Sequence, residues 1–449
     1  MSPEIRRREP RLPTTPRFHR LRQAARNPHT VMYEVIQEHG DLVRWRGLFD
    51  ICIVNHPDFI RPVLTQDYRH FSKNTTHYRM LRQVMGNGLV TNDGPDWVRQ
   101  RRLIQPAFAS RRLARFDRTI NALTSSLLAR WERQDPADAV WIDREMSALT
   151  FDIVGETLFG RDIKEHAAEM AEILDVVNLA STDLRSFLTL YPWVPTTYNR
   201  RWKRAMKRLD GIVYGLMGER GPGGNGSDDL LGRLFAARDE ETGEGMDDRQ
   251  IRDEAVTLIL AGHETSAMAL TWTLYLLATH PEIEARLLEH LEAELHGEPA
   301  KTEDLPRLTY LKQVVQESMR IYPPVWGVVR RAEEETELGD YVLPARTWIG
   351  IVTWALHRHP EFWPDPERFD PDRFAPEQAE ERNFFCYLPF AAGPRTCIGA
   401  GMAMLEIQLI LAQLVPRFRM RVVPGHPVET EAVVTLKPRH GIPVTLSRR

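Results

Sequence analysis

The sequence predicts a mainly α-helical protein that carries small β-sheets. Long segments repeat apolar side chains with the period of a helix, and residues 247–280 form the longest of them. Short runs rich in β-branched residues, at residues 42–45 and 51–54, are typical of short strands. Length alone suggests two to four domains, although a single large enzyme domain is possible, and no internal repeat or long linker divides the chain after a basic lead-in over residues 1–28.

The N-terminal part of the chain after this lead-in combines helices with the two short strands. Apolar residues at helical spacing, such as Val31 and Val35, predict a helix over residues 29–40. After the strands, a break at a proline leads into a predicted helix over residues 58–64. Residues 71–92 show little periodicity, and we expect an irregular connection there.

The second half of the chain contains the predicted long helix. Asp247 can cap its start and Pro281 ends it, which gives a length of about 50 Å. Charged residues within it, Asp253 and Glu254 among them, argue against a membrane span. Further helices are expected over residues 147–159, 309–321 and 402–415, the last ending at Pro416, with strands over residues 325–331, 336–338, 341–343 and 348–352.

Composition and charge narrow the class of protein. Hydrophobic content of 42% and charged content of 27% suit a globular protein with a sizeable core, and a formal net charge of −3 argues against a general nucleic-acid binder. Three cysteines are too few for a disulfide framework, which favours a reducing compartment such as the cytoplasm. The first 30 residues hold eight arginines and no apolar core of the length that a signal peptide or membrane anchor requires.

One glycine-rich loop carries the strongest chemical signal. Cys397 lies in the stretch Phe390-Ala-Ala-Gly393-Pro-Arg395-Thr-Cys397-Ile-Gly399, directly before an apolar helical run. A cysteine before a helix N-terminus faces unpaired N–H groups and the positive end of the helix dipole, which stabilise a thiolate. Such a thiolate is one of the known ligands of haem iron. The alternative is a buried apolar thiol, which we expect for Cys52 and Cys386.

This pattern resembles the haem-binding signature of the cytochrome P-450 family, the haem-thiolate monooxygenases, in its soluble bacterial branch. The resemblance implies the fold of that family, as one large domain over residues 29–449 with haem b buried between two long helices. It further implies that Cys397 is the axial ligand of the iron, that Phe390 packs beside the sulfur and that Arg395 pairs with a haem propionate. Gly399 is expected to allow close backbone approach beside the cofactor.

The middle of the long helix reads Ala261-Gly262-His263-Glu264-Thr265 and resembles the oxygen-activation motif of the family. Ala261 and Thr265 lie four residues apart and share one face. The resemblance implies that Thr265 and Glu264 deliver protons and that Ala261 leaves room for dioxygen. The structural alternative is a hydrogen bond from the threonine hydroxyl to the carbonyl of Ala261. We expect His263 to point away from this face and to have no metal role.

Trp97 and several further arginines are expected to contact the cofactor or a partner protein. Trp97 and Arg101, four residues apart on a predicted helix, resemble a family motif in which both residues reach a haem propionate. Arg330 is the third expected propionate partner, with Arg331 as a rival. Arg99, Arg102, Arg111 and Arg112 add charge nearby, and form either a solvated basic face or a dock for an acidic electron-transfer partner.

A structural ion-pair motif completes the resemblance. Glu317 and Arg320 are three apart on a predicted helix and resemble the Glu-x-x-Arg motif of the family. A third arginine is expected to join them. Arg368 and Arg373 are the candidates, and the fuller Phe-x-Pro-x-Arg-Phe context favours Arg373.

The implied function is insertion of one oxygen atom of O2 into an apolar organic substrate. No flavin- or nicotinamide-binding segment follows the cysteine loop, so electrons from NAD(P)H are expected to arrive through a ferredoxin and its reductase. The motifs favour a fatty-acid- or terpenoid-like substrate. Two alternatives stay open: a peroxygenase driven by peroxide, and a haem-binding sensor without turnover. Substrate identity, regioselectivity, native redox partner and oligomeric state are not encoded in recognisable motifs.

Overall fold

The computed structural model describes residues 12–449 except 18, 25, 47–49, 67, 161–162, 167–168, 171, 174–175, 178–192 and 220–228. Much of the predicted lead-in lies outside the described residues. The same holds for most of residues 170–190, where the sequence predicts a helix, and for residues 221–227, where its glycines predict a flexible loop. Helices dominate the rest and the strands form small sheets, which confirms the predicted fold class.

The chain divides into two compact units, each assembled from separate stretches of sequence. Unit 1 contains residues 1–76, 326–367 and 382–397, and unit 2 contains residues 77–325, 368–381 and 398–449. The single domain expected over residues 29–449 therefore spans two units that share the chain. Each unit is described by itself below.

Unit 1 is built on a five-stranded sheet with the order β1-β2-β8-β5-β3. Strand β2 pairs in parallel with β8, and the other neighbours are antiparallel. Buried Val31, Val35 and Ile36 of helix α2 pack on one side of β1 and β2. The elements are α1 (Leu21–Ala24), α2 (Pro28–His39), β1 (Leu42–Arg46), β2 (Asp50–Val54), α3 (Pro57–Arg61), a π-helical turn (Pro62–Gln66), β3 (Phe71–Ser72), β5 (Val328–Ala332), β6 (Thr336–Leu338), β7 (Tyr341–Leu343), β8 (Trp348–Ile351), α15 (Thr353–Leu356) and short 3-10 turns at Phe384–Cys386 and Gly393–Arg395.

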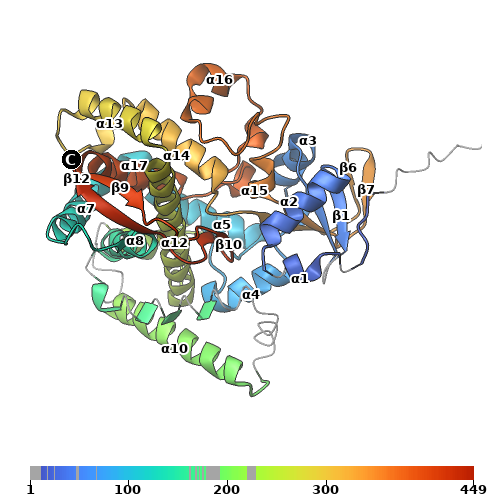
Figure 1. The fold of residues 1–449 in the computed structure, drawn as a ribbon. Helices are drawn as coiled ribbons and strands as arrows, with labels where there is room; N and C mark the ends of the chain where they lie inside the picture. The colour runs from blue at the N-terminus through green and yellow to red at the C-terminus, as the bar shows by residue number, and fades with distance from the viewer. Residues whose placement is uncertain are drawn as a thin grey trace, which may run out of the picture. The chain divides into compact units, whose positions relative to one another are not determined.

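Unit 2 is organised around helix α12, which runs between other helices of the unit (Figure 1). It has 32 residues and is contacted by α8, α10, α13, α14 and α17. The Asp247 side chain accepts a hydrogen bond from Gln250 N, which confirms the predicted cap. The long helices of the unit are α5 (Gly94–Ile104), α7 (Asp117–Trp131), α8 (Ile142–Phe159), α10 (Thr197–Gly218), α12 (Asp248–Thr279), α13 (Pro281–Leu295), α14 (Thr309–Ile321) and α17 (Ala400–Arg417).

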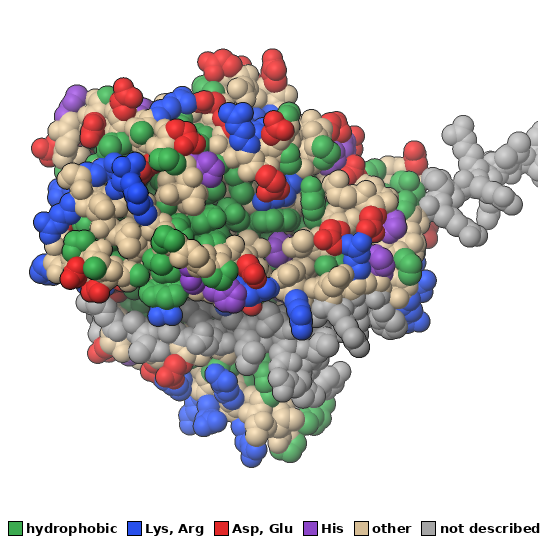
Figure 2. All heavy atoms as spheres, viewed as in Figure 1, with side chains coloured by type: hydrophobic (Ala, Val, Ile, Leu, Met, Phe, Trp, Pro, Cys, Tyr) green, Lys and Arg blue, Asp and Glu red, His purple; other side chains and the backbone are tan. Residues whose placement is uncertain are grey.

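Shorter elements complete unit 2. Strand β12 lies between β4 and β9 in a three-stranded antiparallel sheet, and β10 pairs with β11 in a hairpin. Acidic and basic side chains are interspersed on the face drawn in Figure 2. The remaining elements are α4 (Thr76–Met85), α6 (Ser110–Leu113), α11 (Leu230–Ala236), α16 (Pro376–Glu380), β4 (Val140–Trp141), β9 (Phe418–Val422), β10 (Thr430–Ala432), β11 (Leu436–Pro438), β12 (Pro443–Arg448) and 3-10 turns at Gln105–Phe108, Ala114–Phe116, Lys164–His166, Thr302–Asp304 and Pro371–Phe374.

Two local predictions were wrong. The connection expected over residues 71–92 contains the ten-residue helix α4. Most residues of this segment are polar or glycine, so its sequence shows no clear helical period over its whole length, although Tyr78, Val84 and Met85 are buried in the structure. The helix expected to stop at Pro416 continues to Arg417. Pro416 lacks the N–H that would bond to the carbonyl four residues back, and the helix ends one residue after it.

Candidate active site

The cysteine loop closes on itself directly before α17. Cys397 N donates a hydrogen bond to Phe390 O over 2.9 Å, and Thr396 Oγ1 donates to the same carbonyl over 3.2 Å. Helix α17 begins three residues after the cysteine, with Gly399 as its N-cap. The cysteine therefore lies two residues before the N-cap of a helix, at the place in the chain that the sequence predicts.

Gly393 is the position of this loop that requires glycine. Its φ is +72°, and a Cβ there would lie 2.1 Å from Leu64 O in the turn after α3. Any side chain would push the loop away from that turn. Gly399 has an ordinary φ of −87°, so its backbone does not require glycine.

The three cysteines differ in their surroundings. Cys397 is exposed, whereas Cys52 and Cys386 are buried. Burial raises the pKa of the Cys52 and Cys386 thiols to about 12, so both stay protonated at neutral pH. This confirms that Cys52 and Cys386 are core residues and leaves Cys397 as the thiol that is available to a ligand.

Two predicted propionate partners lie in unit 1. Arg395 Nη1 donates to Phe71 O, and its guanidinium lies 5.4 Å from the Tyr68 ring centroid. Arg330 is 4% exposed, and its Nη1 donates to Val329 O over 3.0 Å. Arg331 is instead held by Glu333, with Nε 3.0 Å from Oε1. The strand thus directs the two neighbouring arginines to different surroundings, and Arg330 is the buried one.

Trp97 and Arg101 are adjacent on helix α5 in unit 2. Trp97 is buried, and the Arg101 guanidinium lies 5.9 Å from the centroid of its ring. The side chain of Asp93 accepts from Gly94 N and caps this helix. The predicted shared face is therefore present, with the guanidinium at cation–π distance from the indole.

Ala261, Glu264 and Thr265 lie in the middle of α12 and are partly buried. Thr265 Oγ1 donates to Ala261 O over 2.6 Å, so the predicted back-bond is present. A hydroxyl that donates one hydrogen bond keeps lone pairs that can accept another. The Thr265 hydroxyl is consequently held in one orientation, and its oxygen can still accept a hydrogen bond from another donor.

His263 connects α12 to α8. Its ring is buried, donates from Nε2 to Ser147 O over 3.0 Å and meets the Phe151 ring edge-on at 5.6 Å. Burial lowers the pKa of His263 to about 4, so it is neutral at physiological pH. His263 therefore makes structural contacts with α8.

The N-terminal part of α12 holds the segment between α4 and α5. Asn87 N donates to Asp253 Oδ2 over 2.8 Å, and Leu89 N donates to Glu254 Oε2 over 3.0 Å. A Cβ at Gly88 would lie 2.0 Å from Thr257 Oγ1. This segment is therefore anchored on the helix that carries Thr265.

Glu317 is the centre of a buried ion-pair network. It accepts from Arg320 Nε over 2.6 Å and from Asp370 N over 3.0 Å, and Arg373 Nε lies 3.4 Å from its Oε1. Arg368 contributes its carbonyl, which accepts from Arg320 Nη2, while its own side chain is exposed. The choice of Arg373 over Arg368 as the third arginine is confirmed.

The sequence pattern does not single out Glu406 on α17. It is 3% exposed, and its side chain hydrogen-bonds Ser266 on α12. Burial raises its pKa to about 8. The available signal is a lone glutamate inside the apolar run from Met402 to Val415.

The predicted site residues fall into two sets. Phe390, Arg395, Cys397 and Arg330 belong to unit 1, where the cysteine loop rests on the turn after α3. Trp97, Arg101, Ala261, Glu264, Thr265 and Gly399 belong to unit 2. The contacts shown among them lie within single motifs: Cys397 N to Phe390 O, the Arg101 guanidinium near the Trp97 ring, and Thr265 Oγ1 to Ala261 O.

A mainly helical protein with an exposed thiol on a tight loop before a helix has the features of a haem-thiolate enzyme. The sequence model of the family described as Cytochrome P450 matches residues 9–442. The chain is 37% identical to cyclooctatin synthase of Streptomyces melanosporofaciens, over 89% of this chain and 87% of that protein. It is 38% identical to cyclooctat-9-en-7-ol 5-monooxygenase of the same organism (86% and 84% covered) and 35% identical to pentalenene oxygenase of Streptomyces avermitilis (89% of each).

The chain belongs to the cytochrome P450 family, and it is an oxidoreductase of the monooxygenase type. The family implies a haem with a cysteine thiolate ligand. The residues present fit that group: Cys397, on the cysteine loop, has an exposed thiol, and a buried guanidinium such as that of Arg330 can donate to a carboxylate. Among the described residues, no helix has the length and apolar character needed to cross a bilayer.

Proposed function

We propose that this P450 hydroxylates a terpenoid in the cytoplasm, with electrons from NAD(P)H supplied through a ferredoxin and its reductase. The observation that carries the substrate class is the similarity to an oxygenase named for pentalenene and a monooxygenase named for cyclooctat-9-en-7-ol, both terpenoids. These identities cover more than four-fifths of each chain. Fatty acids are the second candidate class.

In this proposal Cys397 ligates the haem iron, and the group supplies the oxidising chemistry when bound. Phe390 packs beside the sulfur, where its carbonyl already fixes the loop through Cys397 N. Arg395, Arg330, Trp97 and Arg101 bind the propionates. A guanidinium has five N–H donors, so the bond from Arg395 to Phe71 O leaves donors for a carboxylate. Ala261 and Gly399 contribute close, small-residue contacts.

Thr265 and Glu264 move protons in this proposal. The bond to Ala261 O orients the Thr265 hydroxyl, so that its oxygen accepts a hydrogen bond from water or substrate. Glu264, the next residue, is only partly buried and can exchange protons with solvent. Thr265→Val removes the hydroxyl at nearly constant volume. We expect it to lower product formed per NAD(P)H consumed while the haem content stays unchanged.

Two of the four arginines near α5 have partners within their own chain. Arg102 pairs with Asp239 over 2.6 Å and with Glu241 over 2.7 Å, and Arg99 donates to Gly245 O. Charge reversal at Arg99 or Arg102 would break these contacts within the protein. A change in electron transfer would then not distinguish a lost binding surface for the electron donor from a local structural change.

Arg111 and Arg112 on α6 are better candidates for the acidic electron donor. Both are exposed and form no ion pair within the described residues. Their neighbour Leu113 lies against α17, where a Cβ at Gly401 would be 3.4 Å from Leu113 Cδ1. Their charge is therefore close to the helix that follows Cys397.

The dock is tested with Arg111→Glu/Arg112→Glu, which we expect to slow the first electron transfer at least about tenfold at low salt. The matched control is Arg200→Glu/Arg201→Glu on α10, which reverses two exposed arginines that are likewise adjacent in sequence. An equal effect of both double variants would contradict the dock.

The deciding experiment for the reaction is turnover of the holoenzyme with a panel of terpenes and fatty acids. The optical spectrum is recorded first, and compounds that shift the haem band are incubated with ferredoxin, reductase and NAD(P)H. A hydroxylated terpene containing one atom from labelled O2 is the expected product. Turnover with peroxide alone would favour a peroxygenase, and spectral shifts without product under any electron supply would favour a sensor.

A further inference from the structure

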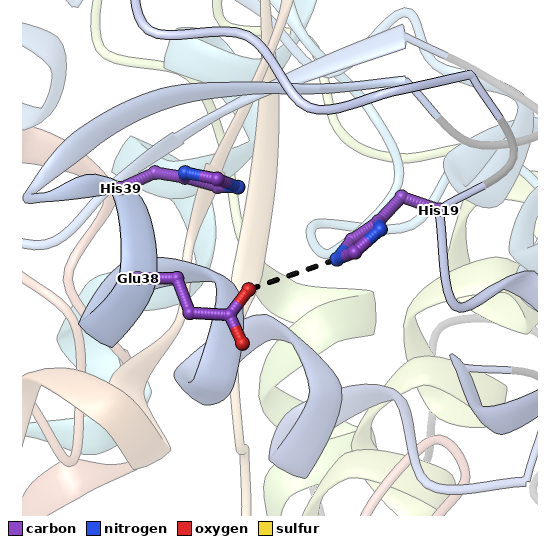
Figure 3. A group of neighbouring side chains, drawn as sticks. All are labelled: His19, Glu38 and His39. Carbon is purple, nitrogen blue, oxygen red and sulfur yellow. Dashed lines mark ion pairs between the residues drawn. The ribbon is translucent and has the colours of Figure 1, made fainter.

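A cluster of two histidines and a glutamate in unit 1 lies outside the proposed active site. His19 precedes α1, while Glu38 and His39 form the last turn of α2. One nitrogen or oxygen atom from each of the three side chains lies within 4.8 Å of the others. Figure 3 shows the two imidazole rings pointing toward each other with the Glu38 carboxylate beside them.

One ring nitrogen of each histidine, Nε2, has no hydrogen-bond partner among the described residues. His19 Nε2 and His39 Nε2 are both shut off from solvent and unpartnered within the described residues. His19 Nε2 lies 3.7 Å from Glu38 Oε2, which is longer than a hydrogen bond. Buried polar nitrogens without partners cost free energy, so the arrangement calls for a group that both rings can bind.

The surrounding backbone holds the three donors in place. The buried Trp45 indole donates to His19 O over 3.2 Å. Arg20, in the left-handed region at φ 52°, directs its guanidinium to Glu34 and to Oε1 of Glu38. That contact leaves Oε2 facing His19 and fixes the orientation of the carboxylate, as outer partners of metal ligands commonly do.

The charge balance favours a cation despite Arg20. Two carboxylates, Glu34 and Glu38, surround the single guanidinium, so the group is negative when the imidazoles are neutral. His39 also ends α2, where the negative pole of the helix dipole attracts cations.

We propose that His19, Glu38 and His39 bind a divalent transition-metal ion, with Zn2+ as the best fit. Two imidazoles and one carboxylate are a common ligand set for zinc, and the fourth tetrahedral position is left to water. Zinc–ligand bonds of about 2.1 Å place neighbouring ligands about 3.4 Å apart. Small side-chain rotations achieve this from the observed separations. The bound ion ties the segment before α1 to the end of α2.

The test is calorimetric titration of Zn2+ into the tag-free, haem-loaded protein. The expected result is saturable binding with one ion per chain, weakened at least about tenfold in His19→Ala and in His39→Ala. The matched control is His70→Ala, which removes an exposed histidine that pairs with Glu334 in the same unit. It should bind Zn2+ like the parent, and all variants should keep the haem absorption band.

X-ray absorption at the zinc edge gives a second readout, with two imidazole ligands expected per ion. Absence of saturable binding at millimolar Zn2+ would overturn the proposal. Equal affinity in the parent and in the His19→Ala/His39→Ala double variant would overturn it as well, because the ion would then bind elsewhere. Neither result bears on the proposed hydroxylation, which turnover assays test separately.

Discussion

Two glutamates in unit 2 are buried to nearly the same degree, and their surroundings are opposite. Glu317 on α14 is 0% exposed and Glu406 on α17 is 3% exposed. Arg320, Arg373 and the Asp370 amide surround the Glu317 carboxylate. Glu406 hydrogen-bonds only the Ser266 hydroxyl, and its Oε1 has no partner in the part of the chain that the structure describes.

The difference shows that burial alone does not decide the charge of a side chain. Burial raises the pKa of both groups, but Arg320, the Asp370 amide and Arg373 oppose this effect at Glu317. No cation does so at Glu406, whose pKa rises to about 8. At neutral pH Glu317 serves as the anion of an ion-pair network, whereas Glu406 carries a proton.

The largest effect is expected from Glu317→Ala. It leaves two guanidiniums, one fully buried, without their carboxylate, which costs about 3–5 kcal/mol of unfolding free energy. We expect the variant to lose haem and cooperative folding together, as measured by haem content and urea denaturation. A stable, haem-loaded Glu317→Ala protein would show that the network contributes little.

Glu406→Gln is expected to change how stability depends on pH. Because the pKa of Glu406 is about 8 in the folded state and 4.5 as an ordinary carboxyl, the folded state binds more protons between these values. The unfolding free energy of the parent therefore falls as pH rises through this window, by at most about 1.4 kcal/mol per unit from this group. Glutamine keeps the shape without the proton.

Denaturation of the parent and Glu406→Gln at several pH values from 5 to 9 measures this difference. The variant should gain stability relative to the parent as pH rises. Parallel pH profiles of the two proteins would mean that Glu406 is ionised in the folded state.

His263→Gln applies the same reasoning to a base. Here burial lowers the pKa, so stability changes with pH in the opposite direction and over a narrower pH range. The pKa of His263 falls from 6.5 to about 4 on burial, so the unfolded state binds more protons between these values. The parent therefore loses stability as pH falls from 6.5 to 4. Glutamine can still donate to Ser147 O and should flatten this acid limb of the stability profile. An unchanged limb would assign the acid sensitivity to other groups.

The smallest effect on stability is expected at an exposed ion pair whose length is nearly the same as that of the buried pair of Glu317 and Arg320. Arg44 and Asp50 meet at 2.7 Å with both side chains more than 40% exposed, whereas the fully buried Glu317 and Arg320 meet at 2.6 Å. Asp50→Asn should cost less than about 1 kcal/mol, and added salt should reduce the cost further. A loss comparable to that of Glu317→Ala would contradict the role given to burial.

Local patterns were enough to predict much of this protein. Helix α14 and strands β6 and β7 have the predicted bounds, because apolar periodicity and turn residues act over a few neighbouring positions. The cap at Asp247 and the back-bond from Thr265 to Ala261 also depend only on residues three or four apart. The sequence alone likewise identified the family, through a fixed spacing of residue types around Cys397.

Other features depend on residues that are distant in sequence, and only the tertiary structure decided them. The approach of Gly393 to Leu64 O, the burial of Arg330 rather than Arg331 and the raised pKa of Glu406 each arise from elements that come together on folding. The same holds for His19, which lies close to Glu38 and His39 although they are about 20 residues away in the sequence. Burial and close approach are properties of the packed chain, so no short sequence window contains them.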